Sequence, residues 1–269
     1  MNDTVELARR IRVQALRMTR HANASHIGSC LSAADLLAVL YGAVMAVAPD
    51  RLEDESRDRF LMSKGHAAAA LYACLAECGF FPRDWLTRYC DDDSPLTGHV
   101  THKGVPGVEV STGALGHGLS IACGFALAGR AATRPFRSYA LLSDGELDEG
   151  SVWEAALFAA HHRLGNLTAL IDANGIQSFG SVAEVLDTEP LADKWRAFGW
   201  RVSECDGHDQ TALRAVLAAT GEDERPHVLI ARTVKGKGIS FMENQLLWHY
   251  RSVDDALLAD ALAELGEPA

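Results

Sequence analysis

Two short apolar runs with a helical segment between them constrain the fold of this chain more than any other feature. The runs are residues 138–142 (SYALL) and 167–171 (LTALI), and each has the length and composition of a buried strand. Between them, small apolar residues recur at helical spacing, at Val152, Ala155, Ala156, Ala159 and Ala160. The stretch therefore predicts a strand, a helix and a second strand, which together form a βαβ unit with parallel strands.

Oxygen-bearing side chains follow both predicted strands. Asp144 comes shortly after the first strand and Asn174 after the second. Because parallel strands end at the same edge of a sheet, we expect these two side chains to lie close together. Carboxylate and amide oxygens suit Mg²⁺ or Ca²⁺. A simpler interpretation stays open, in which Asp144 caps a helix that starts near Leu147 and Asn174-Gly175 is only a turn.

The remaining chain continues the alternation of strands and helices. Further strands are predicted at 60–63, 200–205 and 227–234, and helices at 4–21, 32–46 with Ser32 as cap, up to Gly79, within 111–130, and at 190–198, 210–219 and 253–265. This order predicts an α/β fold, a mostly parallel sheet with helices on both faces. We expect one domain over residues 1–269 with a C-terminal helical extension near 253–265. The helix within 111–130 is almost uncharged, so it should be buried.

Charge and cysteine usage exclude several classes of protein. The net charge of -11, from 25 basic and 36 acidic residues, argues against nucleic acid or an anionic membrane surface as a partner. We find no signal-peptide core and no apolar run as long as a membrane span, so a cytoplasmic protein without membrane contact is expected. The six cysteines lack the spacing of a disulfide framework or zinc site, and we expect reduced thiols.

Four histidines fall in predicted loops beside glycine or other small residues. They are His26 in ASHIGS, His66 in SKGHAA, His99 in LTGHVTH and His249 in LLWHY. A single loop histidine is more often solvated or structural than catalytic. Four of them, most beside predicted sheet edges, favour a site that binds anions or moves protons. All four are therefore candidate catalytic residues.

Several segments of the chain resemble the N-terminal half of transketolase, a thiamine diphosphate enzyme. SDG, a 28-residue spacer and Asn174 are similar to the GDG…N cofactor motif of that superfamily. Other similar segments occur in the family's order from about residue 5 to 255: ASHIGSCLSAADLLAVLY, DRFLMSKGHAAAALYA, LTGHVTHKGVPGVEVSTGALGHGLS, DGELDEGSVWEAALFAAHHRLGNLTALIDANGIQ, GWRVSECDGHD and TVKGKGISFMENQLLWH. The resemblance implies a thiamine diphosphate-binding domain.

This resemblance also implies a cofactor and a metal. Thiamine diphosphate would bind with Mg²⁺ (or Ca²⁺), and the metal ligands would be Asp144, the Asn174 side chain and the Ile176 backbone carbonyl. Gly145 and Glu146 would belong to the cofactor site, with the Gly145 amide as a donor to the diphosphate. A bound cation would offset the phosphate charge that an acidic protein otherwise repels.

The remaining site residues are likewise implied by the resemblance. His66 and His249 match family histidines near the diphosphate and the reacting carbon. Leu115, with Gly113 and Gly116 allowing close approach, matches the loop that lines the thiazolium and aminopyrimidine rings.

Two histidines would face the substrate. His26 and His99 match family residues that contact the hydroxyl and carbonyl oxygens of a ketose donor. Near them the chain departs from the family: Ile27 replaces a proline and Cys30 a small residue. Ser143 stands where the cofactor motif has its first glycine, which would cost on the order of 1 kcal/mol if that position needs a positive φ.

The resemblance ends before the pyrimidine-binding domain of transketolase, which carries the glutamate that activates the cofactor. We therefore expect one subunit of a split transketolase, completed by a C-terminal subunit in an α2β2 assembly and transferring a two-carbon ketol unit from a ketose to an aldehyde. Two alternatives stay open. One is another thiamine diphosphate enzyme, of two-carbon transfer or 2-oxo acids, in specialised metabolism. The other is a non-catalytic scaffold subunit.

Overall fold

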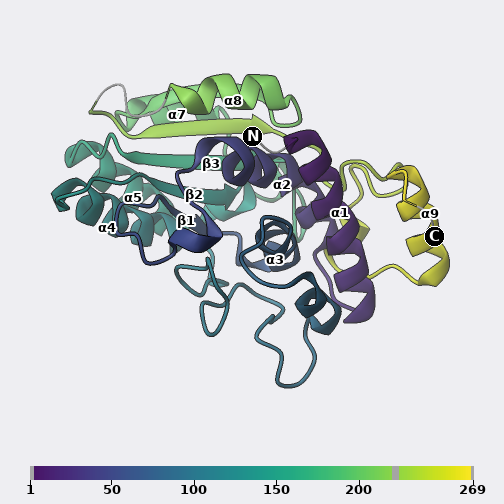
Figure 1. Cartoon of the computed structure of the whole chain (residues 1–269). Helices are drawn as coiled ribbons and strands as arrows, with labels where there is room; N and C mark the ends of the chain where they lie inside the picture. Colours follow the sequence, from purple (N-terminus) through teal and green to yellow (C-terminus); the bar gives the residue numbers. More distant parts are fainter. Residues whose placement is uncertain (1–2, 220–223, 268–269) are drawn as a thin grey trace.

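The centre of the molecule is a five-stranded parallel sheet (Figure 1). The computed structural model describes residues 3–219 and 224–267 of the chain. The strand order is β1-β2-β3-β7-β6, and the strands are β1 (Arg59–Met62), β2 (Ser138–Ser143), β3 (Leu167–Ala173), β6 (Arg201–Asp206) and β7 (His227–Arg232). A short antiparallel pair, β4 (Ile176–Gln177) and β5 (Gly180–Ser181), follows β3. The predicted α/β fold with a parallel sheet is confirmed.

Helices cover both faces of this sheet, as expected. Their bounds are α1 (Thr4–His21), α2 (Ile27–Val39), α3 (Ala68–Glu77), α4 (Gly118–Ala131), α5 (Gly150–His161), α6 (Val182–Val185), α7 (Leu191–Ala197), α8 (Gln210–Ala218) and α9 (Asp255–Glu264). Because neighbouring strand residues point to opposite faces, each central strand contributes to two apolar layers.

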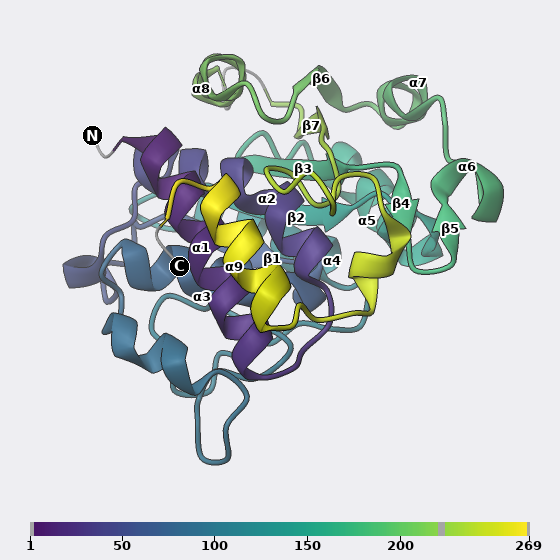
Figure 2. The ribbon, with the colours of Figure 1, turned by 90° about the vertical axis from the view of Figure 1, so that its right-hand side faces the viewer.

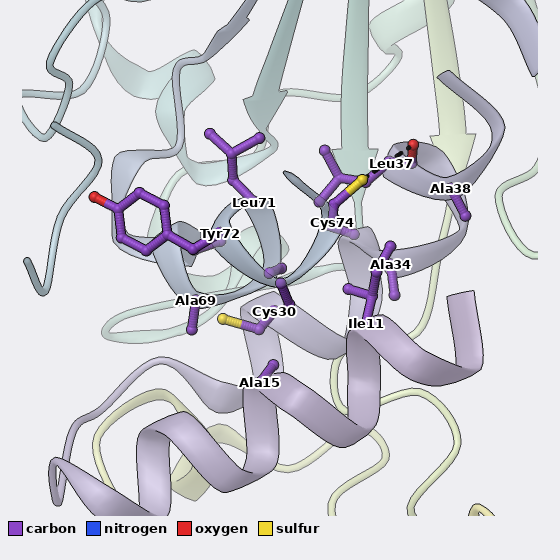
Figure 3. Close-up of a cluster of buried hydrophobic side chains, with 14 of the residues drawn as sticks. Ile11, Ala15, Cys30, Ala34, Leu37, Ala38, Ala69, Leu71, Tyr72 and Cys74 are labelled. Atoms are coloured by element: carbon purple, nitrogen blue, oxygen red, sulfur yellow. Dashed lines mark hydrogen bonds between the residues drawn. The ribbon is translucent and has the colours of Figure 1, made fainter. Parts of the chain in front are cut away.

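One layer lies between the sheet and α1, α2, α3 and α8. It takes up Tyr139 and Leu141 from β2, which are fully buried. Figure 3 shows part of this layer, where Ala34 and Cys30 of α2 lie near Ile11 and Ala15 of α1. Small side chains at such contacts let the helix backbones approach closely. The layer fixes α2, and with it the loop that carries His26.

A second layer lies between the other face and α4, α5 and α7. It takes up Ala140 and Leu142, the alternate residues of β2, together with Trp195 of α7. The last helix, α9, lies beside α1 (Figure 2), and its Ala261 belongs to the first layer. The predicted helix near 253–265 is therefore present, and Asp254 caps it by accepting a hydrogen bond from Leu257 N.

The start of α2 differs from the expectation. The helix begins at Ile27, and Ser32, the expected cap, lies fully buried in its interior. Its hydroxyl donates to Asp172 Oδ2 on β3 at 2.6 Å. The hydroxyl of a cap residue accepts a hydrogen bond from a backbone N–H in the first turn of its own helix. The Ser32 hydroxyl instead donates to a buried carboxylate on β3.

Two further expectations are corrected. The helix α4 is only half buried, because Ser120 and Gly124 on its outer face are exposed. The segment Ile27–Val44 is a helix long and apolar enough to cross a membrane, although no such run was expected. In this structure 83% of that segment is buried, so its apolar side chains already contact the protein core.

All six cysteines are free, as predicted.

Candidate active site

The carboxyl ends of β2 and β3 bring Asp144 and Asn174 together. Ser143, the last residue of β2, pairs in register with Asp172 of β3. Each strand then turns into a loop at the same edge of the sheet, and both loop residues line one cavity of about 220 Å³. The expected meeting of the two side chains is therefore present in the structure.

The Asp144 carboxylate ties the two loops to each other. Its Oδ1 accepts from Gly145 N at 2.8 Å, and its Oδ2 accepts from Gly175 N at 2.6 Å. The residue also stands at the start of a 3₁₀ turn, Gly145–Asp148, so the simpler capping interpretation is partly correct. Burial and the nearby charge of Asp172 raise the pKa of Asp144 to about 6. A bound cation would stabilise the ionised form of a carboxylate that is buried in this way.

The other predicted metal ligands lie beside Asp144. Asn174 and Ile176 line the same cavity, and Asn174 Oδ1 accepts from Ile176 N at 3.1 Å. Among the residues that the structure describes, no group of three His, Cys, Asp or Glu side chains converges as a metal cage. One carboxylate, one amide and one carbonyl are an incomplete set of ligands. Such a set suits Mg²⁺, since this ion usually keeps several waters and binds phosphate oxygens as well.

All four predicted histidines line this cavity. His26 lies at their centre, with ring centroids 4.9 Å from His249, 5.2 Å from His66 and 5.9 Å from His99. The rings come from two loops and the two 3₁₀ turns Gly65–Ala67 and Leu246–His249, so only the folded chain brings them together.

Burial keeps three of these rings uncharged at neutral pH. It lowers the pKa of His26 to about 4 and that of His249 to about 3, and it holds the pKa of His66 well below the usual range. Charges on neighbouring histidines and lysines act in the same direction. Neutral imidazoles can donate and accept hydrogen bonds, so these rings suit proton transfer and oxygen recognition better than charge pairing with an anion.

His26 has an unusual backbone conformation. Its φ is 73°, in the left-handed region, which few residues other than glycine adopt. Its N–H donates to the carbonyl of His249 at 3.0 Å. Left-handed non-glycine residues are enriched at active sites, because the surrounding structure must hold them there. This bond fixes the two histidines relative to each other.

Lys235 is a site residue that the sequence did not reveal. It comes from the segment after β7 and lines the cavity, yet it is only 1% exposed. Its ammonium donates to the Ile176 carbonyl at 3.1 Å and to Ser29 Oγ at 3.3 Å, and His249 Nδ1 is also 3.3 Å away. Burial and the charge of Lys64 lower its pKa to about 8, so it is a cation at neutral pH. An anion in this cavity would meet a positive charge there.

A buried ion pair lies beneath the site. Lys64 and Asp172 are both fully buried, and Lys64 Nζ donates to Asp172 Oδ2. Ser32 and Thr233 also donate to this carboxylate. Because Lys64 precedes the His66 turn, the pair anchors that turn to β3. The lysine ammonium and these hydroxyls hold the pKa of Asp172 below its usual range despite burial.

The loop with Leu115 forms another wall of the cavity. Gly113 and Leu115 line it, together with Gly145. Gly116 and Glu146, expected to contact the cofactor, do not line it: Glu146 is fully buried behind the wall and accepts from Gly116 N at 2.9 Å. Burial holds the pKa of Glu146 above its usual value, although its hydrogen-bond donors act in the opposite direction.

The replacement at Ser143 carries no conformational cost in this structure. Ser143 is the last residue of β2, and it is not among the described residues with positive φ. The glycine conformation considered for this position is not needed here. Its side chain lines the cavity, as does Ser178 in the β4–β5 turn.

The carboxyl edge of a parallel sheet, with oxygen-bearing side chains at two neighbouring strand ends and a buried cation, suits an anionic ligand such as a diphosphate. Residues 4–267 match the family model described as transketolase, thiamine diphosphate binding domain. The chain therefore belongs to the transketolase family of thiamine diphosphate-dependent transferases, and it carries the family's cofactor-binding domain.

Several similar proteins are matched over most of their own length. A subunit of the apulose-4-phosphate transketolase of Actinobacillus succinogenes is 44% identical over 89% of this chain and 87% of its own length. The protein of the same name from Phocaeicola vulgatus is 40% identical over 98% of this chain and 95% of its own length. The 6-deoxy-6-sulfo-D-fructose transketolase subunit SqwG of a Clostridium species is 40% identical over 89% and 88%.

Solved transketolases share the fold but are longer. Transketolase from Leishmania mexicana superposes with a TM-score of 0.93 and 31% identity over the whole of this chain, which spans 42% of that protein. Transketolase from Campylobacter jejuni superposes with a TM-score of 0.90 and 29% identity, and this chain spans 44% of it. This chain thus corresponds to about two fifths of a solved transketolase.

Proposed function

We propose that this chain is the cofactor-binding subunit of a two-chain transketolase, which transfers a two-carbon ketol unit from a ketose to an aldehyde. One observation carries the proposal: the four histidines, the predicted metal ligands and the buried cation Lys235 all line one cavity at the carboxyl edge of the sheet. The names of the similar proteins, each called a subunit of a transketolase, support the two-chain organisation.

Each group in the cavity has a proposed task. Asp144, Asn174 and the Ile176 carbonyl would hold Mg²⁺ against the diphosphate, and Lys235 would pair with the phosphate oxygens. His26 and His99 would bind the oxygens of the ketose and exchange protons with them. When bound, thiamine diphosphate supplies a nucleophilic carbon and an electron sink for cleavage of a carbon–carbon bond.

A partner chain completes the proposed site. Asp144 is the one carboxylate among the described residues that line the cavity, and it is committed to the two loops and the metal. The resemblance implies that the acid that activates the cofactor comes from a second polypeptide, and we propose that the partner subunit supplies it. Large apolar side chains within two residues of the cavity-lining Ser178 and His249 are exposed, which suits docking of that partner: Phe179, Leu247 and Tyr250.

We further propose an α2β2 assembly in the cytoplasm. Closed two-fold symmetry is the commonest arrangement of soluble oligomers, and the six free cysteines suit a reducing compartment. The mass of the co-purified complex in solution tests the stoichiometry. A mass that corresponds to one copy of each chain would contradict it.

Activity of the reconstituted pair tests the proposal. The chain, co-purified with its partner, is assayed against ketose donors and aldehyde acceptors with and without thiamine diphosphate and Mg²⁺. We expect ketol transfer that depends on both additions. Turnover of a 2-oxo acid instead of a ketose would favour the alternative thiamine enzyme. Absence of cofactor binding by the pair would favour the scaffold interpretation.

A further inference from the structure

Glu146 lies behind the cavity and joins three loops. Its side chain is 0% exposed. Its Oε1 accepts from the Ser63 hydroxyl and from Gly116 N at 2.9 Å, and its Oε2 accepts from Ser143 N at 3.3 Å. All three partners are donors, so they are satisfied together by an ionised carboxylate, which has only acceptors.

Each partner of Glu146 lies within three residues of one that lines the cavity. Ser63 leads into the turn with His66, Gly116 follows Leu115, and Ser143 precedes Asp144. One carboxylate therefore holds the ends of β1 and β2 and the Leu115 loop in a single arrangement. Because charged hydrogen bonds are the strong ones, this contact restrains the loops more than a neutral one would.

Close packing around this carboxylate leaves little room for the loops to shift. A Cβ added at Gly118 would lie 2.2 Å from Ser63 Oγ, and one at Gly116 would lie 2.4 Å from Ser151 Oγ. These backbones approach each other as closely as glycine allows. A change at Glu146 would therefore be felt in the positions of the neighbouring loops and not be absorbed by free space.

We propose that Glu146 is a positioning residue for the cofactor: it holds the Asp144 turn and the Leu115 loop at the spacing that thiamine diphosphate requires. The inference rests on the proposed function. It assigns no contact between Glu146 and the cofactor. A purely structural carboxylate would stabilise the fold without setting cofactor affinity, so the two roles differ in a measurable way.

The chain offers a matched control at the opposite edge of the sheet. Asp58 is also buried and also joins two loops, because it accepts from Ala46 N at 2.8 Å and from Arg137 N at 2.9 Å. In both Glu146→Gln and Asp58→Asn, an amide group replaces one acceptor and faces a donor. Both variants should therefore lose some stability, but only the first lies behind the cavity.

Calorimetric titration of the two-subunit complex with thiamine diphosphate in Mg²⁺ tests the proposal. We expect Glu146→Gln to weaken cofactor binding by about 10-fold, which is the size of effect seen when a residue that holds a metal ligand in place is mutated. We expect Asp58→Asn to lower the melting temperature by a similar amount but to bind the cofactor like wild type. Without cofactor, hydrogen exchange should be faster in peptides covering 113–117 and 141–146 of Glu146→Gln.

Unchanged affinity of Glu146→Gln, or equal weakening in Asp58→Asn, overturns the proposal. If Glu146→Gln does not fold, Ser63→Ala takes its place; it removes one donor, and we expect weaker cofactor binding of about 3-fold, in line with one lost hydrogen bond. Unchanged affinity there has the same meaning. Failure of the wild-type complex to bind thiamine diphosphate would instead contradict the proposed function.

Discussion

Asp144 accepts a hydrogen bond of 2.6 Å from the backbone N–H of Gly175, which joins the loop after β2 to the loop after β3. Through this bond the chain sets the spacing of its proposed metal ligands by itself. The loops therefore need little rearrangement when a metal binds, and little ordering entropy is lost at that moment. The same carboxylate would also bind the metal. A mutation that removes its charge but keeps its size can therefore test the metal role.

Asp144→Asn keeps the size of the side chain but removes its charge. We expect at least a 100-fold loss in affinity for thiamine diphosphate in the presence of Mg²⁺, because a charged ligand of a hard cation is replaced by a neutral one. Calorimetric titration of the two-subunit complex measures this. Asp193→Asn, an exposed carboxylate on α7, is the control and should bind normally. Equal affinity of Asp144→Asn and wild type would refute the metal assignment.

His99→Ala tests whether the donor is a ketose. His99 lines the cavity 5.9 Å from His26, measured between ring centroids. We expect kcat/KM for a ketose donor to fall by about 100-fold, as for loss of a group that binds or protonates substrate, while thiamine diphosphate affinity stays within a factor of about three. Steady-state kinetics of the pair with several donors measures this. An unchanged kcat/KM for the ketose in His99→Ala would contradict the proposed contact of His99 with the donor.

Lys235→Met removes the buried positive charge but keeps the aliphatic chain that packs against Gly28. We expect about 10-fold weaker binding of inorganic diphosphate, because a charge-assisted contact is lost. Titration with diphosphate and Mg²⁺ checks this. Lys237→Met is a matched control two residues on, since Lys237 is partly exposed and pairs with Glu243. Equal effects of both substitutions would indicate only a general loss of positive charge.

The histidine cluster predicts lower stability in acid. Burial lowers the pKa of His26 from 6.5 to about 4, so between these values the unfolded chain binds a proton that the folded chain does not. The free energy of unfolding should therefore fall as the pH decreases from about 6.5 to about 4. Urea denaturation at several pH values measures the slope. His26→Asn, which tolerates the left-handed backbone, should lose stability less steeply, and an identical slope would contradict the assignment.

The buried Lys64–Asp172 pair predicts a large stability effect. Lys64→Met leaves the Asp172 carboxylate buried without its cation, which should lower the free energy of unfolding by about 3 kcal/mol. Urea denaturation of the single variant and of Lys64→Met with Asp172→Asn measures it. The double variant should recover part of the loss. Arg196→Met, which breaks an exposed pair with Asp193, should change little.

Local patterns were sufficient for much of the fold. Strand and helix periods predicted the βαβ unit around Asp144 and Asn174, because buried elements require an apolar repeat that is visible within a few residues. Parallel strands end at one edge, so the meeting of these two residues also followed from the sequence. The site histidines were found because they lie in small-residue loops and match a known family.

Long-range contacts decided the rest. Lys235 could not be recognised, because lysine is normally exposed and its burial depends on how the segment after β7 returns to the cavity. Ser32 looked like a helix cap, but the hydroxyl pairs with Asp172, which is 140 positions away in the chain. Glu146 follows the cofactor motif directly, yet it faces Ser63 and Gly116 behind the cavity wall.

The chain's own sequence thus determined most of the elements and the meeting of Asp144 and Asn174 at the carboxyl edge of the sheet, since both depend on short-range periodicity and strand direction. Tertiary structure alone decided which charges are buried and that Glu146 lies behind the cavity wall and holds its loops. Burial and pairing depend on neighbours from distant segments, and no local pattern encodes those neighbours.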